Sequence, residues 1–321
     1  MPTEVSKYHN DAQFPQTTMK DDEIDLRELF SAIWQGKWLI IAVTAVFAIG
    51  AIIFAIKQPN IYKSETLLAQ ASEEQGGGLS GLASQFGGLA SLAGVNLGAK
   101  GGVDKTQMAI EVIKSRQFAA DFIQKHNILP DLMAAEEWDI AQDKLIYDPE
   151  LYDAQANTWV REVKAPFKPE PSMQEAFKVF RQVVMVNTAK ETGMVTIAVE
   201  HLSPTVAQQW IIWLVQDINK TMKDRDVAEA NRSREFLSQQ IALTNVADIK
   251  TILYKLIEEQ AKTIMFAEVR DEYVFKTIDP AFVPEEKAKP KRALICVLGT
   301  MLGGMLGIMF VLVRHFVRKG D

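Results

Sequence analysis

Two long apolar runs stand out from the mixed hydrophobic and polar pattern of this chain, one near each end. They cover Trp38–Ile56 and Ala293–Val313, and neither contains a charged residue. A helix rises about 1.5 Å per residue, so each run would reach about 28–31 Å, close to the thickness of the hydrocarbon core of a bilayer. One charged residue at its centre would cost about 2.5–3.5 kcal/mol. The pattern therefore predicts two transmembrane helices.

The pattern that follows the first run predicts strands and short helices. Ser172 and Glu175 form a capping box that begins a helix running to about Phe180. Alternating apolar residues on both sides of a turn at Thr192 and Gly193 predict a hairpin. The elements expected here are a strand over Ile61–Gln70, one or two helices over Asp104–Asn127, an irregular stretch over Ala134–Pro171, and hairpin strands over Val183–Asn187 and Met194–His201.

The next part of the chain predicts two long helices. Ser203 is a typical N-cap with Pro204 at the first helical position, and no further proline or glycine occurs before Pro280. Helices of this length without internal caps favour a protruding helical hairpin over about residues 203–270. The expected elements are helices over Pro204–Thr244 and Val246–Val269, and a last strand over Tyr273–Ile278.

This order of elements predicts an α+β fold, in which two transmembrane helices flank an α/β base that carries a long protruding helical hairpin. Basic residues before the first helix favour cytoplasmic termini weakly, and those beside the second favour the opposite orientation. The expected domains are a tail over 1–37 with an amphipathic helix over Asp22–Gly36, a transmembrane helix over 38–56, a main domain over 57–292, a second transmembrane helix over 293–313, and a tail over 314–321.

The charge balance of the main domain limits the partners that it can bind. Residues 57–292 contain 28 basic and 33 acidic residues, a net charge of −5. A nucleic-acid partner would require a basic face, so we expect none. The single cysteine, Cys296, lies in the second apolar run, so the main domain has neither a thiol nor a disulfide. The absence of cysteine from the main domain fits an oxidising compartment.

No motif in the chain indicates catalysis, a cofactor or a metal site. In the glycine-rich stretch 76–102, Lys100 is followed by Gly101 rather than by the Ser or Thr of a phosphate-binding loop. The four histidines are far apart and match no zinc-binding spacing, so solvated or locally hydrogen-bonded histidines are expected. Adjacent carboxylates such as Glu258 and Glu259 point in different directions on a helix. We therefore expect a protein that is not an enzyme.

The second apolar run carries small residues at a helical spacing. Gly299, Gly303 and Gly307 form a G-x-x-x-G-x-x-x-G pattern, and Cys296 precedes it on roughly the same face. Small residues at this spacing let two helices approach closely in lipid. The partner is either the first apolar run of the same chain or a neighbouring copy. Oxidative cross-linking of Cys296 into a dimer is expected only in the second case.

The residues that flank the two apolar runs resemble those of a known family. Ile24–Trp38 before the first run and Tyr62–Leu67 after it look like the start of the Wzz-type chain-length determinants, which are bacterial polysaccharide co-polymerases. Phe275–Pro284 and Lys289–Arg292 resemble the proline-rich segment that these proteins carry before their second helix. The prolines that carry this resemblance are Pro280, Pro284 and Pro290.

This resemblance implies a location, an assembly and a function. Members of the family are inner-membrane proteins with two spans, a periplasmic main domain and both termini in the cytoplasm. They form homo-oligomeric rings and regulate the modal chain length of O-antigen lipopolysaccharide, or of a related capsule or exopolysaccharide. A separate polymerase in the same membrane extends this glycan on a lipid-diphosphate carrier, so the members are not themselves its glycosyltransferases.

Two other classes of protein stay open at this point. An accessory adaptor subunit of a polysaccharide export system would have the same two spans and main domain. A two-span sensor would need a cytoplasmic output module, for which residues 314–321 are too short. The stretch 76–102 resembles relatives that serve capsule or exopolysaccharide systems, so the kind of glycan also stays open.

Overall fold

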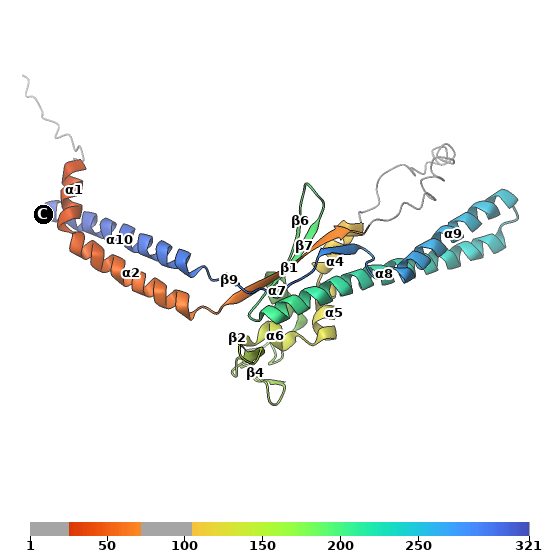
Figure 1. Ribbon diagram of the computed structural model, residues 1–321, viewed down its shortest axis with the longest axis horizontal. Helices are drawn as coiled ribbons and strands as arrows, with labels where there is room; N and C mark the ends of the chain where they lie inside the picture. The colour runs from red at the N-terminus through yellow and green to blue at the C-terminus, as the bar shows by residue number, and fades with distance from the viewer. Residues whose placement is uncertain (1–25, 72–104, 321) are drawn as a thin grey trace, which may run out of the picture. The chain divides into compact units, whose positions relative to one another are not determined.

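The structure is a computed structural model that describes residues 26–71 and 105–320 (Figure 1). The glycine-rich stretch 76–102 and the residues before position 26 lie outside these ranges. Contacts divide the chain into two compact units, Met1–Lys57 with Arg292–Asp321, and Gln58–Lys291. Helices make up the first unit and a mixture of helices and sheet makes up the second, so the predicted α+β fold is confirmed.

A central antiparallel sheet organises the second unit. Its strands lie in the order β6-β7-β1-β8, and the short β9 also pairs with β1. Their bounds are β1 Ile61–Gln70, β6 Val184–Thr188, β7 Val195–His201, β8 Phe275–Asp279 and β9 Lys287–Lys289. Ser64 pairs with Val199 and Leu68 with Val195, so the buried side chains of β1 and β7 share one face. The predicted first strand and hairpin are confirmed, whereas β9 was not foreseen.

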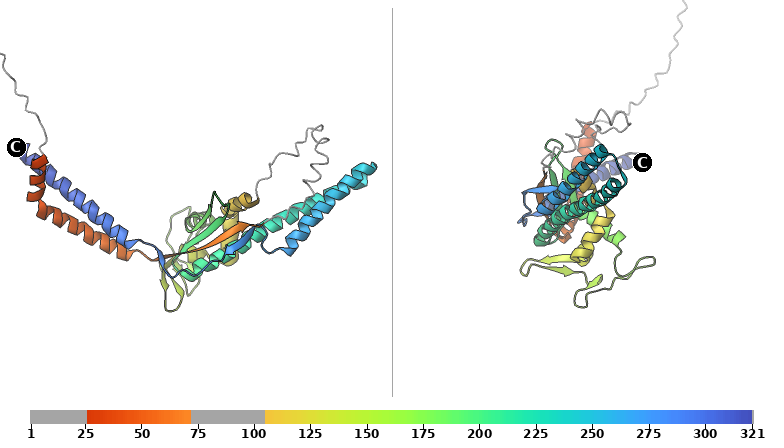
Figure 2. Two further views of the ribbon diagram at one scale, coloured as in Figure 1. Left: turned by 45° about the horizontal axis from the view of Figure 1, so that its top comes forward. Right: turned by 90° about the vertical axis from the view of Figure 1, so that its right-hand side faces the viewer.

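Helices cover one face of this sheet (Figure 2). They are α4 Lys105–Ile113, α5 Arg116–His126, α6 Leu129–Met133, α7 Met173–Val183 and the first half of α8 Pro204–Leu243. The helix that follows α8 is α9 Ala247–Val269. On α8, Trp210, Leu214 and Ile218 recur at intervals of one helical turn and pack into one core with Leu68 and Ile197 of the sheet. Burying a side chain of this size stabilises the fold by about 1.5–3 kcal/mol.

The second half of α8 and all of α9 form a helical hairpin that extends beyond the sheet (Figure 1). Beyond Met222, Ala230 is the one buried residue of α8, and Ala267 is the one buried residue of α9. The predicted N-cap at Ser203 is confirmed, as is the reversal of the chain near Thr244. The helical hairpin therefore contains few buried residues along its length.

The stretch that was expected to be irregular, Ala134–Pro171, contains two small hairpins, which corrects the prediction. Their strands are β2 Ala135–Asp139 with β3 Lys144–Tyr147, and β4 Tyr152–Asp153 with β5 Thr158–Trp159. Asp139 and Asp153 each accept hydrogen bonds at Oδ1 from two backbone N–H groups that follow them. Such turns reverse the chain between two short strands.

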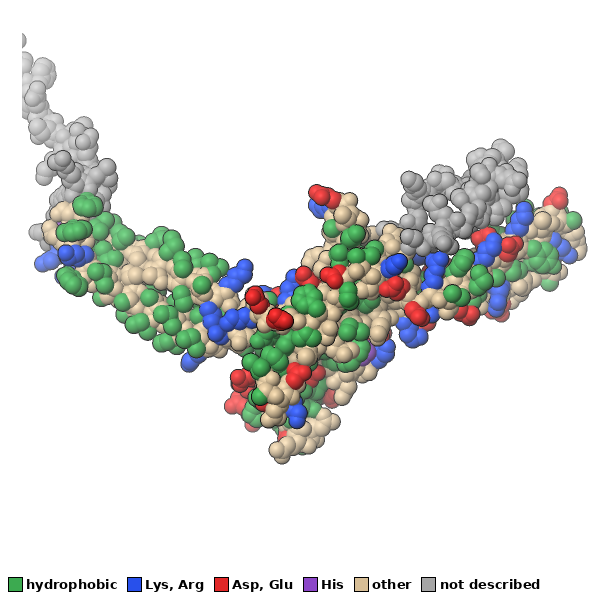
Figure 3. Space-filling view, in the orientation of Figure 1, with side chains coloured by type: hydrophobic (Ala, Val, Ile, Leu, Met, Phe, Trp, Pro, Cys, Tyr) green, Lys and Arg blue, Asp and Glu red, His purple; other side chains and the backbone are tan. Residues whose placement is uncertain are grey.

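The first unit consists of helices α1 Leu26–Gln35, α2 Lys37–Lys57 and α10 Arg292–Gly320. By length and composition, α2 and the part of α10 up to Arg318 could each cross a membrane. Most of their large hydrophobic side chains are exposed, and Figure 3 shows such side chains spread over the visible face of both helices. Exposed apolar surface of this extent is typical of helices that face lipid rather than of core helices.

Candidate functional site

The glycine face of α10 contacts α2 of the same chain within the first unit. A Cβ atom added at Gly299 would lie 2.5 Å from the Cβ of Ala51, and one added at Gly303 would lie 2.6 Å from the Cβ of Phe47. Side chains do not tolerate contacts as short as these. The absence of a side chain at both glycines therefore sets how closely the two helices approach.

Gly307 and Cys296 lie at the two ends of this face. A Cβ atom at Gly307 would lie 3.1 Å from the Cα of Ile40, whereas the Cys296 thiol is partly exposed. Of the two partners that the sequence left open, the structure places the first apolar run of the same chain against the glycines. A role of Cys296 or of the glycines in joining copies stays a prediction.

Polar side chains bond backbone carbonyls within this pair of helices, and Thr44 and Arg292 are two of them. Thr44 donates from Oγ1 to the carbonyl of Ile40 at 2.8 Å, and Arg292 donates from Nε to the carbonyl of Ala55 at 3.1 Å. The Ala55 carbonyl belongs to the last turn of α2, where a helix leaves carbonyls without partners. Arg292 therefore ties the start of α10 to the end of α2.

The proline-rich segment runs beside β1 in the second unit. Its prolines are Pro280 directly after β8, Pro284, and Pro290 directly after β9. Because proline has no N–H group, the chain leaves the ladder of the sheet between β8 and β9. Hydroxyl groups of β1 bond it instead. Ser64 donates from Oγ to the carbonyl of Phe282 at 2.6 Å. Thr66 donates from Oγ1 to the carbonyl of Asp279 at 2.7 Å.

A buried asparagine, which sequence reasoning missed, joins α8 to β8. Asn219 accepts hydrogen bonds at Oδ1 from the N–H groups of Val274 and Phe275, at 2.8 and 2.9 Å. Its Nδ2 donates to the carbonyl of Phe275 at 3.1 Å, and the residue is 4% exposed. The side-chain amide of Asn219 therefore holds the backbone in place where the chain returns from the helical hairpin to the sheet. Its place on a helix face with buried Met222 was the only available signal.

Two histidines make local hydrogen bonds. The Nε2 of His126 lies 2.8 Å from Oδ2 of Asp217, and its ring stacks on Trp213. His201 accepts a hydrogen bond at Nδ1 from the N–H of Ser203 at 3.1 Å, and burial lowers the pKa of His201, which favours the neutral ring. Within the described residues, no three His, Cys, Asp or Glu side chains gather as a metal site.

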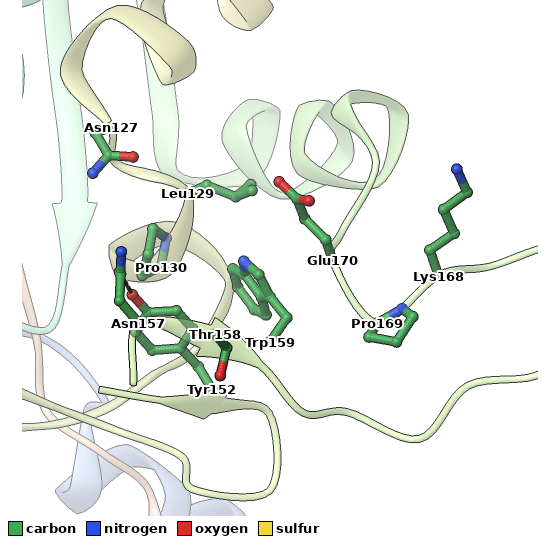
Figure 4. Close-up of a pocket in the computed structure, with 10 residues that line it drawn as sticks. All are labelled: Asn127, Leu129, Pro130, Tyr152, Asn157, Thr158, Trp159, Lys168, Pro169 and Glu170. Atoms are coloured by element: carbon green, nitrogen blue, oxygen red, sulfur yellow. Dashed lines mark hydrogen bonds between the residues drawn. The ribbon is translucent and has the colours of Figure 1, made fainter. Parts of the chain in front are cut away.

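A polar and aromatic pocket of about 520 Å³ lies beside the β4–β5 hairpin (Figure 4). The turn from α5 to α6 and the loop before α7 form its other walls. Tyr152 and Trp159 supply aromatic rings, whose centroids are 5.1 Å apart, and Asn127, Lys168 and Glu170 supply polar side chains. Sequence reasoning gave these residues no role, because they come from three separate segments with no shared motif.

Arg161 fixes the loop that forms one wall of this pocket. Its guanidinium donates to the carbonyls of Pro169 and Lys168 at 2.6 and 2.8 Å. It also donates to both carboxylate oxygens of Glu175, at 2.9 and 3.1 Å. Glu175 forms the predicted capping box with Ser172 at the start of α7, so that prediction is confirmed. Because a two-pronged arginine–carboxylate pair is strong and geometrically specific, the loop is held in one arrangement.

Acid is expected to weaken this attachment. The hydrogen bond from Arg161 lowers the pKa of Glu175 from 4.5 to about 2. A carboxylate whose pKa is lowered on folding stabilises the fold above its unfolded pKa and loses this effect as the pH falls to its folded pKa. The free energy of unfolding should therefore fall from pH 4.5 to about pH 2, and Glu175→Gln should flatten this part of the profile. Denaturant titrations of both proteins across this range measure it, and equal slopes would contradict it.

Two family models match the chain. Residues 22–126 match Wzz, described as "Chain length determinant protein", and residues 238–316 match GNVR, described as "G-rich domain on putative tyrosine kinase". The first range contains α2 and β1, and the second contains α9, β8, β9 and most of α10. The first match thus includes one candidate membrane helix, and the second includes most of the other. No curated protein matches the chain.

Two solved structures with some similarity to the chain are polysaccharide co-polymerases. One, "full-length bacterial polysaccharide co-polymerase", is 15% identical with a TM-score of 0.38 and covers 92% of this chain and 99% of its own. The other, a fragment of WzzB from Salmonella Typhimurium, is 10% identical with a TM-score of 0.27 and covers 72% of this chain and 100% of its own. The family-model matches at its two ends support the resemblance to the Wzz-type chain length determinants that the sequence predicted.

Proposed function

We propose that this chain is a scaffold of the bacterial inner membrane that regulates the modal length of a surface polysaccharide made by a separate polymerase. One observation carries the proposal. Residues 22–126 match the chain length determinant model, and they contain both a candidate membrane helix and the central strand of the sheet. The proposed product is O-antigen lipopolysaccharide, or a related capsule or exopolysaccharide, on a lipid-diphosphate carrier. The proposed orientation places residues 57–292 in the periplasm and both termini in the cytoplasm.

The helical hairpin supports a role in assembly. Large apolar side chains are exposed along the second half of α8 and along α9, among them Phe236, Leu243, Ile249 and Ile252. Exposed apolar surface on a long helical pair favours contact with another protein. A second copy of the chain would offer the same surface, so we propose a homo-oligomeric ring in which copies meet along their hairpins.

A gel of the surface polysaccharide tests the proposed function. A strain that lacks the gene should lose its modal glycan length and produce a broad distribution, because nothing then biases when the polymerase releases the chain. Expression of the full chain should restore the mode, and an empty vector should not. An unchanged length distribution in the deletion strain would contradict the proposal. Complete loss of surface glycan would instead support the alternative, an accessory adaptor subunit of an export system.

A further inference from the structure

The pocket beside the β4–β5 hairpin is lined by polar side chains that are available to bind a ligand. Among the described residues, five side chains that line it make no hydrogen bond or ion pair with the rest of the protein: Asn127, Thr158, Trp159, Lys168 and Glu170. Together they offer N–H and O–H donors beside amide, hydroxyl and carboxylate acceptors. The pocket can therefore form several hydrogen bonds with a ligand without breaking any bond that holds the fold.

Aromatic rings give the same pocket an apolar side. Trp159 is partly exposed and packs on Tyr152, which is 6% exposed and donates its O–H group to Asn157. In Figure 4 the indole nitrogen of Trp159 and the carboxylate of Glu170 both point toward the side on which Leu129 lies. A ring face next to such donors and acceptors suits a ligand that is apolar on one face and polar at its rim. A sugar ring has this character, with C–H groups on its face and hydroxyls around it.

All three walls of the pocket are held in place by local bonds. Asn127 and Asn157 adopt left-handed backbone conformations, with φ of 51° and 54°, that close the turn after α5 and the β4–β5 turn. Arg161 fixes the third wall through its bonds to the loop before α7. A site that is already ordered loses less conformational entropy when a ligand binds. The pocket is therefore prepared for a ligand before the ligand arrives.

Charge and size narrow the class of ligand. Lys168 and Glu170 place one positive and one negative group at the pocket, so neither an anion nor a cation is favoured overall. Its volume of about 520 Å³ falls within the range of about 300–1,000 Å³ that is usual for small-molecule sites. We propose that this pocket binds a neutral saccharide segment of the glycan. The inference rests on the proposed function, which brings a glycan to the protein.

Saturation-transfer NMR and calorimetry on the purified full chain test this site. The probe is the mixture of neutral oligosaccharides released by partial hydrolysis of the surface polysaccharide of the host strain. The micelle should be a phosphocholine detergent, because the headgroup of a maltoside is itself a saccharide and would compete. Trp159→Ala should weaken binding at least about tenfold, which corresponds to about 1.4 kcal/mol. Glu170→Ala and Asn127→Gly should weaken it about threefold to tenfold, as expected for the loss of one hydrogen bond.

The variants separate a binding role from a structural one. Glu170 is exposed and has no bonding partner among the described residues, and glycine readily adopts the left-handed conformation of Asn127. Both substitutions should therefore leave the fold intact even if Trp159→Ala disturbs it. Phe167→Ala is the matched control, because Phe167 is 55% exposed next to the same loop but does not line the pocket. Phe167→Ala should bind like the wild type.

Two outcomes would overturn the inference: no transfer to the oligosaccharides from the wild-type protein, or equal binding by the wild type, Glu170→Ala and Asn127→Gly. If the deletion strain shows altered glycan length while the purified chain binds no saccharide, only the saccharide site fails. If the purified chain binds through Glu170 and Asn127 while the deletion strain keeps its glycan length, the proposed function fails and the site stands.

Discussion

Replacing Asn219 with alanine is expected to lower the free energy of unfolding by about 2–5 kcal/mol. The change removes the acceptor for the N–H groups of Val274 and Phe275, which are 3% and 0% exposed, so water cannot replace it. Each buried donor left without a partner costs about 1–3 kcal/mol. The effect should be seen as an earlier transition in urea titrations of the detergent-solubilised full chain, followed by tryptophan fluorescence.

Asn231→Ala is the matched control for this prediction. Asn231 lies on the same helix, α8, but is exposed and makes no side-chain hydrogen bond with the described residues. It therefore reports the change in helix propensity alone, which should stay within about 0.7 kcal/mol. If the two variants were equally stable, the bonds of Asn219 to the start of β8 would contribute nothing net. The same result would remove the reason to regard this residue as the anchor of the helical hairpin.

Replacing Gly303 with leucine is expected to push α10 away from α2. The first atom of the new side chain would lie 2.6 Å from the Cβ of Phe47 and 3.1 Å from the Cα of Thr44. Neither atom can move aside by a side-chain rotation, so the helices themselves must separate. Overpacking of this kind costs about 1–3 kcal/mol, and the loss of close helix contact in lipid adds to it.

Spin labels on Cys296 and on a cysteine introduced at Gly50 measure this separation. Cys296 is the only native cysteine, and a side chain at Gly50 meets nothing within 4 Å. Labelled protein should be diluted with unlabelled protein, so that the distances come from within one chain. Gly304→Leu is the control, because a Cβ atom there meets only the Thr44 hydroxyl, at 3.8 Å. Equal label distances in Gly303→Leu and Gly304→Leu would show that the glycine face does not set the contact.

The local features of this fold could be predicted because they depend on residues that are neighbours in the sequence. The capping box that begins at Ser172 and the N-cap at Ser203 connect residues within one helical turn. The small hairpin β4–β5 could not be predicted, because each of its strands contains two residues and leaves no period to read. The strand β9 was missed for the same reason.

The candidate sites could be predicted only in part. The spacing of Gly299, Gly303 and Gly307 predicted a close helix contact, but a face of small residues fits many helices, so its partner stayed open. No motif indicated the role of Asn219, because its bonding partners lie more than fifty residues further along the chain. The pocket beside β4–β5 was also hidden, since its walls meet only after α5 and α7 have packed together.

By itself the sequence determined that two helices near the ends of the chain are apolar enough to span a membrane. It also determined that helices and strands with a mixed apolar and polar pattern lie between them. These properties follow from composition and short-range order, which the chain carries whatever its fold. Only the tertiary structure decided that α2 lies against the glycine face of α10 and that Asn219 joins the helical hairpin to the sheet. It also decided that the turn after α5, the β4–β5 hairpin and the loop before α7 form one pocket. Those contacts join residues far apart in the chain, and the packing of the whole core selects them from many alternatives that are locally equivalent.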